Sequence, residues 1–137
     1  MKQKHYLLAI CLVLLCLTSC KKDSTTQPST YPIAGLWIGT YTFLTQPPLY
    51  FSFTIYPDGT MSYKSKGIND YTFYANGTWT LNGTAFSYTA TTTNTPGGTQ
   101  STQTGTATYN ATGTLTNGIN RDVATNQSGT FNMTRVN

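Results

Sequence analysis

The sequence predicts an all-β domain: an antiparallel up-and-down meander of seven or eight strands, closed or nearly closed into a small barrel. Threonine is the most frequent residue, aromatic residues are common and glutamate is absent, a composition that favours strands. After residue 20, no segment repeats its apolar residues with the 3.6-residue period of a helix. A β-sandwich is the main alternative. Consecutive tight hairpins favour the meander, because Greek-key sandwiches need longer crossovers.

Residues 1–19 are predicted to be a signal peptide. Lys2 and Lys4 give the segment a positive start, residues 6–17 are apolar, and Ser19 is small. The apolar run is shorter than the roughly 20 residues that a membrane-spanning helix requires. The segment is therefore expected to direct export and not to cross the membrane as a permanent helix.

The end of this segment, Leu17-Thr18-Ser19-Cys20, resembles the lipobox of bacterial lipoproteins, in which a peptidase cuts before an acylated cysteine. The resemblance implies that Cys20 carries lipid, and two or more acyl chains hold a protein stably at a membrane. It also implies anchoring in the bacterial envelope. The outer membrane is the expected location, because Lys21 stands where inner-membrane lipoproteins of enteric bacteria carry aspartate. Whether the domain faces the periplasm or the cell surface stays open.

Residues 20–34 contain the lipidated cysteine and a polar stretch with two prolines, which predicts a flexible tether. The barrel domain is expected to span residues 35–137. All three cysteines lie at or before Cys20, so the domain has no disulfide.

The first predicted strand covers residues 36–44, and the first predicted hairpin comes after it. Residues 50–56 form the next strand, and 57–59 form a three-residue loop with glycine at the position that needs a positive φ. This loop sets Phe53 opposite Tyr63, so that the apolar faces of the two strands agree.

A second hairpin is predicted around Asn82-Gly83, the preferred two-residue loop, joining residues 77–81 to 84–93. This register sets Trp79 opposite Phe86. Residues 71–75 are expected to run into the hairpin through a bulge at 76–77.

Strict alternation over residues 104–116 predicts either one long bent strand or two strands that meet near Asn110. Residues 92–103 and 117–127 are polar and are predicted to be loops. Residues 128–136 form the last strand.

The ends of the domain resemble the lipocalin pattern, which has Gly-x-Trp on the first strand and an arginine near the end of the last. Here these residues are Gly35, Trp37 and Arg135. The resemblance implies a barrel whose first and last strands are neighbours. It also implies that the guanidinium stacks on the indole to close one end, a contact that contributes about 0.5–2 kcal/mol. The domain is shorter than typical lipocalins, and no helix flanks the predicted strands.

Composition excludes most catalytic chemistry. After Cys20 the chain has no histidine, glutamate or further cysteine, which leaves no imidazole or thiolate for catalysis or metal binding. Of the aspartates, Asp23 lies in the tether, Asp58 in a turn, and Asp70 and Asp122 in predicted loops. We therefore expect no enzyme activity, no metal site and no cofactor.

The predicted inward-facing residues are mostly aromatic, and they either fill the barrel or line a pocket. Their number in a short chain favours a mostly filled core. These residues are Tyr41, Phe43, Phe51, Phe53, Tyr63, Phe73, Trp79, Phe86, Tyr88 and Phe131.

The expected function is that of a lipid-anchored envelope protein with a lipocalin-like domain that binds a small hydrophobic ligand. The alternative is a surface module with a filled core that contacts protein or glycan through its loops or its threonine-rich face. Nucleic acid is not an expected partner, because Lys64 and Lys66 are only a local pair and form no basic patch.

Overall fold

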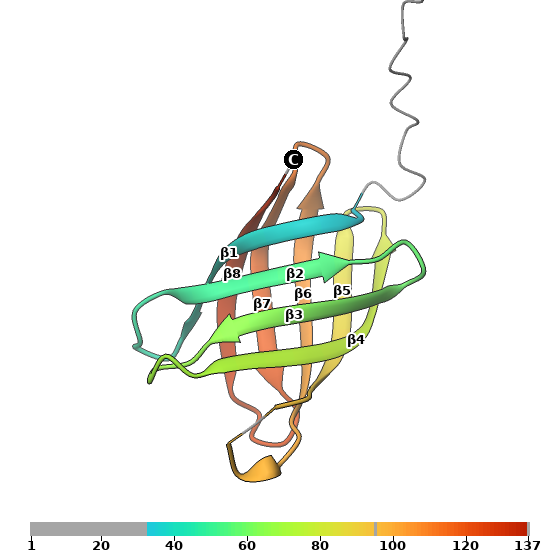
Figure 1. Ribbon diagram of the computed structural model, residues 1–137. Helices are drawn as coiled ribbons and strands as arrows, with labels where there is room; N and C mark the ends of the chain where they lie inside the picture. The colour runs from blue at the N-terminus through green and yellow to red at the C-terminus, as the bar shows by residue number, and fades with distance from the viewer. Residues whose placement is uncertain (1–32, 95, 137) are drawn as a thin grey trace, which may run out of the picture.

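A computed structural model describes residues 33–94 and 96–136, and these residues form a closed eight-stranded barrel (Figure 1). Each strand pairs antiparallel with the next, and the last pairs with the first. The elements are β1 (Gly35–Phe43), β2 (Leu49–Ile55), β3 (Thr60–Lys66), β4 (Thr72–Asn82), β5 (Ala85–Thr92), η1 (Pro96–Gly98), β6 (Thr102–Asn110), β7 (Thr114–Asp122) and β8 (Ser128–Arg135). The predicted all-β meander is confirmed, and closure leaves the barrel without a free sheet edge. Residues 1–32, including Cys20, lie outside the described part.

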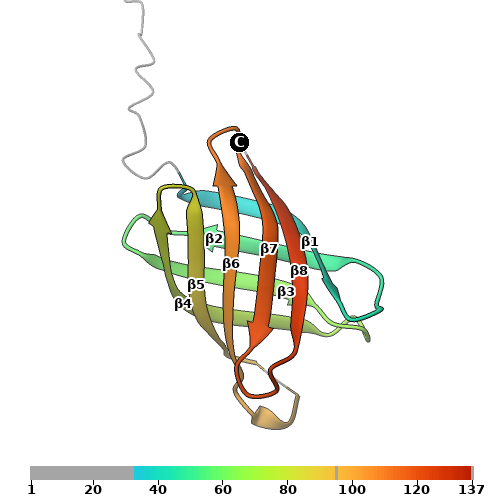
Figure 2. The same cartoon turned by 180° about the vertical axis from the view of Figure 1, so that it is seen from behind.

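The two ends of the barrel differ in their connections (Figures 1 and 2). We call one end the closed end. Short connections join its strands at residues 56–59, 83–84 and 111–113. We call the other end the mouth, and its connections are longer, at residues 44–48, 67–71, 93–101 and 123–127. Ile33, the first described residue, belongs to the closed end: its carbonyl accepts a hydrogen bond from Trp37 Nε1 at 2.9 Å, and its side chain is fully buried.

The hairpin of β2 and β3 has the predicted register. Ile55 pairs with Met61 and Phe53 with Tyr63. The loop contains Gly59 at φ +85°, where glycine has no steric cost. Turn chemistry and the two apolar faces require the same register here, which is why local sequence was enough to predict it.

The predicted register of the β4–β5 hairpin is wrong by two residues. Trp79 pairs with Tyr88, not with Phe86, and the two-residue loop is Gly83-Thr84. Gly83 has φ +60° and occupies the first loop position, as in a turn that needs glycine there. Because the error is two residues, every side chain keeps its predicted face. The strand β4 is continuous, and its pairing with β3 shows no shift at the predicted bulge.

The alternation over residues 104–116 belongs to two strands, β6 and β7, joined by a turn at residues 111–113. The prediction that residues 117–127 form a loop is wrong for its first half, because β7 continues to Asp122. The pairing shifts after Leu115, so that Asn117 and Gly118 together oppose a single residue of β6. This β-bulge turns Asn120 and Asp122 toward the barrel interior. Because the inward-facing residues in this part of β7 are polar, the sequence shows no apolar alternation that would predict a strand.

Aromatic rings fill the barrel from the closed end to its middle. Phe53 is fully buried and contacts the rings of Tyr88 and Phe131, with centroids 5.1 and 5.5 Å apart. Space for these rings comes from inward-facing glycines: a Cβ atom on Gly105 would lie 2.2 Å from the ring of Tyr88. Among the described residues, one hydrophobic core cluster runs from Ile33 to Met133, and all eight strands contribute to it.

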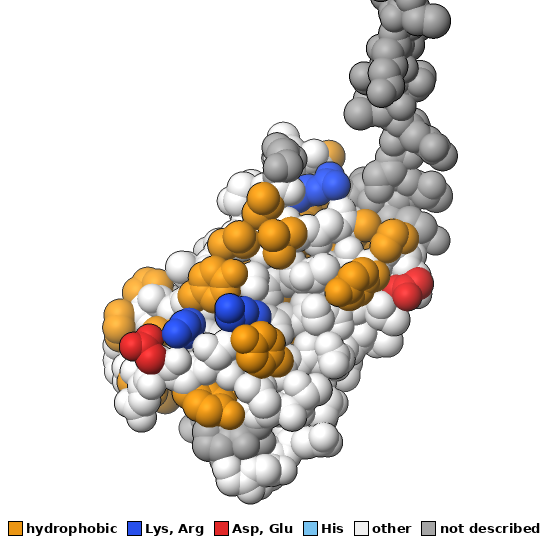
Figure 3. Space-filling model, in the orientation of Figure 1, with side chains coloured by type: hydrophobic (Ala, Val, Ile, Leu, Met, Phe, Trp, Pro, Cys, Tyr) orange, Lys and Arg blue, Asp and Glu red, His pale blue; other side chains and the backbone are white. Residues whose placement is uncertain are grey.

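On the face shown in Figure 3, hydrophobic and basic side chains are scattered among other residues. On the face formed by β1–β4, Leu36 and Ile38 are partly exposed. The ammonium of Lys64 lies 6.0 Å from the ring centroid of Tyr50 and 5.9 Å from that of Tyr74. Such contacts contribute about 0.5–1 kcal/mol at exposed sites. Among the described residues, no helix is long and apolar enough to span a bilayer.

Candidate functional site

A cavity of about 270 Å³ opens at the mouth of the barrel. One side of it is aromatic and the other is polar, and several elements contribute to each. The aromatic residues are Tyr41, Phe43, Phe51, Tyr63 and Phe73. The polar residues are Ser65, Thr92, Ser101, Gln103, Asn120, Asp122, Thr125 and Gln127. Pockets with an apolar lining and a few convergent polar groups are typical ligand sites.

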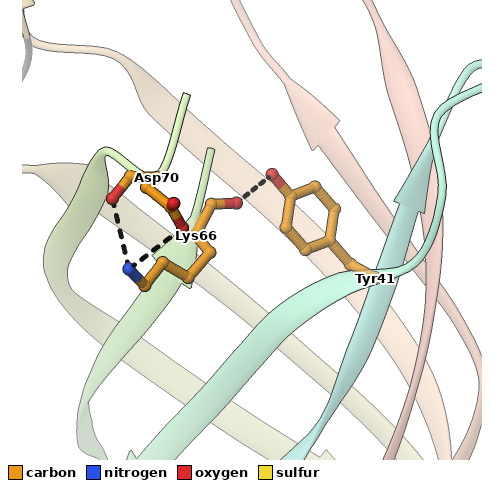
Figure 4. A network of polar contacts seen from close by, with 3 residues as sticks. All are labelled: Tyr41, Lys66 and Asp70. Carbon is orange, nitrogen blue, oxygen red and sulfur yellow. Dashed lines mark hydrogen bonds and ion pairs between the residues drawn. The ribbon is translucent and has the colours of Figure 1, made fainter. Parts of the chain in front are cut away.

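Hydrogen bonding and ring packing hold the aromatic side of the cavity in place. Tyr41 reaches from β1 across β2, and its hydroxyl donates a hydrogen bond of 2.9 Å to the carbonyl of Lys66 at the end of β3 (Figure 4). Its ring packs on Phe51 with centroids 5.3 Å apart. The ammonium of Lys66 turns away toward Asp70, 3.5 Å from a carboxylate oxygen. Tyr41 is therefore fixed at both its ring and its hydroxyl.

A second hollow of about 320 Å³ adjoins the cavity, between the connections at residues 44–48 and 67–71. It shares Tyr41, Phe43 and Phe73 with the mouth cavity, so these three half-buried rings border both spaces.

A chain of hydrogen bonds organises the polar side and runs in one direction. The Tyr88 hydroxyl donates to Asn120 Oδ1 at 2.6 Å, Asn120 Nδ2 donates to Gln103 Oε1 at 2.8 Å, and Gln103 Nε2 donates to Asp122 Oδ2 at 2.9 Å. A carboxylate can only accept, so it sets the orientation of both amides. Burial raises the pKa of Tyr88 well above its usual value, which keeps its phenol a donor. Every donor in the chain points toward Asp122.

Asp122 accepts hydrogen bonds through both carboxylate oxygens. Oδ1 accepts from the backbone amides of Ala124 and Thr125 at 3.0 and 2.8 Å, and from the Thr125 hydroxyl. Oδ2 accepts from Ser101 Oγ and from Gln103. Partial burial acts against the charge, but the hydrogen bonds from Ser101, Thr125 and Ala124 outweigh it and hold the pKa of this carboxyl below its usual value. Asp122 is therefore an anion at neutral pH.

The aromatic residues predicted from the sequence divide into two groups. Tyr41, Phe43 and Phe73 line the mouth, with Phe51 and Tyr63 at the base of the cavity. The others lie away from the cavity and pack the core: Phe53, Phe86, Tyr88 and Phe131 are buried, and Trp79 is half-buried against Phe86. The interior is thus filled over most of its length and hollow at one end.

The pair Trp37 and Arg135 lies at the closed end. The two residues are directly opposite each other in the register of β1 and β8. The Trp37 indole is fully buried and meets the ring of Tyr109 edge-on, with centroids 6.1 Å apart. The guanidinium of Arg135 lies beside Gly35, where a Cβ atom would come 3.1 Å from its Nε.

Sequence reasoning missed the polar half of the cavity. Ser101, Gln103, Asn120 and Asp122 lie in segments that were predicted to be loops. The inward orientation of Gln103 could have been predicted, because it continues the alternation in which Gly105 and Ala107 of β6 point inward. For Asn120 and Asp122 the bulge in β7 breaks the phase, and local alternation does not reveal them.

Among residues 33–94 and 96–136, no three His, Cys, Asp or Glu side chains come together in a group that could hold a metal ion. Every buried side-chain nitrogen or oxygen in this part of the chain has a hydrogen-bond partner. No protein-family model, curated protein or solved structure matches the chain. Its function therefore has to be inferred from its own residues.

Proposed function

We propose that this chain is a lipid-anchored protein of the bacterial envelope whose lipocalin-like barrel binds a small ligand at its mouth. The observation that carries the proposal is the cavity of about 270 Å³, with rings on one side and an oriented hydrogen-bond chain on the other. Its volume lies just below the ~300–1,000 Å³ of typical small-molecule sites. The ligand is therefore small, with an apolar body for the rings and a polar group for the opposite side.

The resemblance to lipocalins gains support from the geometry at the closed end. Strands β1 and β8 are neighbours, and Trp37 and Arg135 are paired in their register. The buried side chains of Trp37 and Ile33 pack this end, opposite the mouth. A barrel packed at one end and hollow at the other suits the binding of one small molecule.

The proposed anchor is compatible with an accessible mouth. Cys20 precedes Ile33 by residues 21–32, a stretch that spans at most about 40 Å when fully extended. This stretch joins the barrel at the closed end, because Ile33 lies there. The point of attachment is therefore at the opposite end of the barrel from the mouth. Binding, and not catalysis, is proposed, because the polar side chains of the mouth donate to one another and to Asp122.

Native mass spectrometry tests the binding proposal. Residues 24–137, which include the whole barrel, are exported to the periplasm, purified and sprayed under native conditions. We expect a copurified small molecule that is lost in Phe73→Ala, which removes a ring from the cavity. Leu81→Ala is the matched control, because Leu81 packs against the core from the other end of β4. An empty protein that also binds no member of a hydrophobic fragment library contradicts the proposal.

The anchor is tested separately on the full-length chain. Cys20→Ala should abolish labelling with a palmitate analogue and release the protein from the membrane fraction. Cys16→Ala, in the same segment, should change neither result. Labelling that persists in Cys20→Ala would refute lipidation at this residue.

A second candidate, the surface interaction module, has one observation in its favour. A groove of about 530 Å³ runs over the outside of β4–β7, lined by hydroxyls such as Thr80, Thr89 and Thr104 and by Ile119 and Arg121. Such a surface suits a glycan or an extended peptide. If it is the functional site, Ile119→Glu should abolish binding on a glycan array or to envelope proteins, while any ligand in the mouth is retained.

A further inference from the structure

We infer that the mouth cavity selects small organic cations, amines with an aromatic or apolar body, over carboxylates such as fatty acids. This inference rests on the proposed function and adds the sign of the ligand's charge. It comes from three features of the mouth: a carboxylate with no counter-ion among the described residues, neutral donors that hold it, and aromatic rings that line the same cavity.

The first feature is that the charge of Asp122 has no counter-ion among the described residues. Among the described residues, Asp122 is the one charged side chain that lines the cavity. The ion pair that the described part contains, Lys66–Asp70, lies on the rim and is neutral overall. Arg121 is exposed, and its guanidinium donates to the side chain of Asn126 in the connection at 123–127. The cavity itself therefore carries a formal charge of −1.

The second feature is that the described groups that donate hydrogen bonds to Asp122 are all neutral. The hydroxyls, backbone amides and the Gln103 amide that donate to it hold the anion in place but do not cancel its charge. A lysine or arginine paired with Asp122 would hold the carboxylate in place and also neutralise its charge. The held carboxylate therefore still attracts a cation through space and repels an anion. Hydrogen bonds from Ser101, Thr125 and Ala124 also lower the pKa of Asp122, so the charge persists at mildly acidic pH.

The third feature is the aromatic surface that lines the same cavity. Tyr41, Phe43 and Phe73 are half-buried at the mouth. The face of an aromatic ring attracts a cation, and the attraction grows as water is excluded. An ammonium group in this cavity is attracted by the charge of Asp122, and the apolar body of such a ligand packs on the rings. A carboxylate in the same cavity meets a like charge, which is selection by repulsion.

Three probes that differ mainly in charge test the inference: phenethylamine (cation), 2-phenylethanol (neutral) and phenylacetate (anion) at pH 7. Each is titrated into ¹⁵N-labelled residues 24–137, and the side-chain amide signals of Gln103 and Asn120 report binding at the mouth. We expect phenethylamine to bind at least about tenfold more tightly than phenylacetate, with 2-phenylethanol between them. Added salt should narrow the difference.

Asp122→Asn is the decisive variant, and Asp58→Asn is its control. Asp58 is a fully exposed turn residue of the closed end, so its substitution removes the same charge far from the mouth. Asp122→Asn should weaken phenethylamine about tenfold and leave 2-phenylethanol unchanged, which also shows that the cavity has kept its shape. Asp58→Asn should alter neither affinity.

The outcomes separate the two proposals. If all three probes shift the mouth amides with equal affinity in the wild-type protein, charge selection is wrong and ligand binding stands. The same holds if Asp122→Asn keeps the preference for phenethylamine. If no probe shifts these amides, the proposed binding function is overturned together with the inference.

Discussion

Replacing Gly105 with alanine should destabilise the barrel by about 2–4 kcal/mol. A Cβ atom there would lie 2.2 Å from Tyr88 Cε1 and 2.5 Å from Cζ, whereas ordinary carbon contacts need about 3.5–4.0 Å. The ring must retreat by more than about 1 Å. However, Tyr88 is 4% exposed and its ring packs on that of Phe53, with centroids 5.1 Å apart. Overpacking of this kind costs about 1–3 kcal/mol.

The same displacement pulls the Tyr88 hydroxyl away from Asn120 Oδ1, now 2.6 Å distant. A buried donor left without its partner costs about 1–3 kcal/mol. Alanine has less backbone freedom than glycine in the unfolded chain, which offsets the loss of stability by up to about 1 kcal/mol. The central values of the two costs, about 2 kcal/mol each, less the returned entropy, give a net loss of about 3 kcal/mol. This loss corresponds to a fall of at least about 10 °C in Tm for a domain of this size.

Urea denaturation followed by tryptophan fluorescence measures the loss. Thr106→Ala, at the next position of β6 with its side chain exposed, is the control and should change stability by less than about 0.5 kcal/mol. In a Tyr88→Leu background, Gly105→Ala should cost less than half as much, because the opposing ring is gone. A Gly105→Ala protein as stable as the wild type would refute the packing argument.

Three further predictions concern the closed end and the titrating groups. Trp37→Ala and Arg135→Ala should couple by about 0.2–1 kcal/mol in a double-mutant cycle, as expected for directly opposed residues, and additive losses would argue against contact. Raising the pH above 10 should unfold the protein. Burial raises the pKa of Tyr63 and Tyr88 in the folded state. The stability that these two phenols contribute below the pKa of an unfolded tyrosine is therefore lost as the pH rises from that value toward the folded ones. Phenolate absorbance should then rise together with the loss of near-ultraviolet circular dichroism, and ionisation of all tyrosines without unfolding would contradict this. The pKa of Asp122 is lower in the folded protein than in the unfolded chain. Its carboxylate therefore stabilises the fold at pH values above the unfolded pKa of about 4, and this stabilisation is lost as the pH falls through the folded pKa. Asp122→Asn should flatten this acid limb of the stability curve, and an unchanged limb would show that Asp122 contributes nothing.

The parts of the fold that could be predicted are those in which local and cross-strand signals agree. In the β2–β3 hairpin, the Pro57-Asp58-Gly59 loop and the facing apolar residues Phe53 and Tyr63 specify one register. In the β4–β5 hairpin, Asn82-Gly83 and Gly83-Thr84 are both acceptable two-residue loops, and the two registers bury the same faces. Sequence pattern therefore determined which side chains point inward but not which ones pair.

The candidate site was only half predictable for a related reason. Its aromatic side follows from unbroken alternation on β1 and β2 and from the apolar residues of β4. Its polar side consists of side chains that a hydrophobicity pattern assigns to loops. Their inward orientation is stable because the hydrogen bonds among Gln103, Asn120 and Asp122 satisfy them once the barrel closes. That compensation depends on β6 and β7 being paired, which one strand read alone does not reveal.

The bulge in β7 decides the chemistry of the mouth. Leu115 points into the core, and unbroken alternation from it would turn Ile119 and Arg121 inward as well. Asn117, at φ +53°, takes up the extra residue, and the phase reverses after it, so that Asp122 faces the cavity and Arg121 faces solvent. With the opposite phase, a guanidinium would line the same space and the cavity would attract anions. The sign of the charge that the mouth presents to a ligand therefore depends on one backbone irregularity, four to five residues away along the strand.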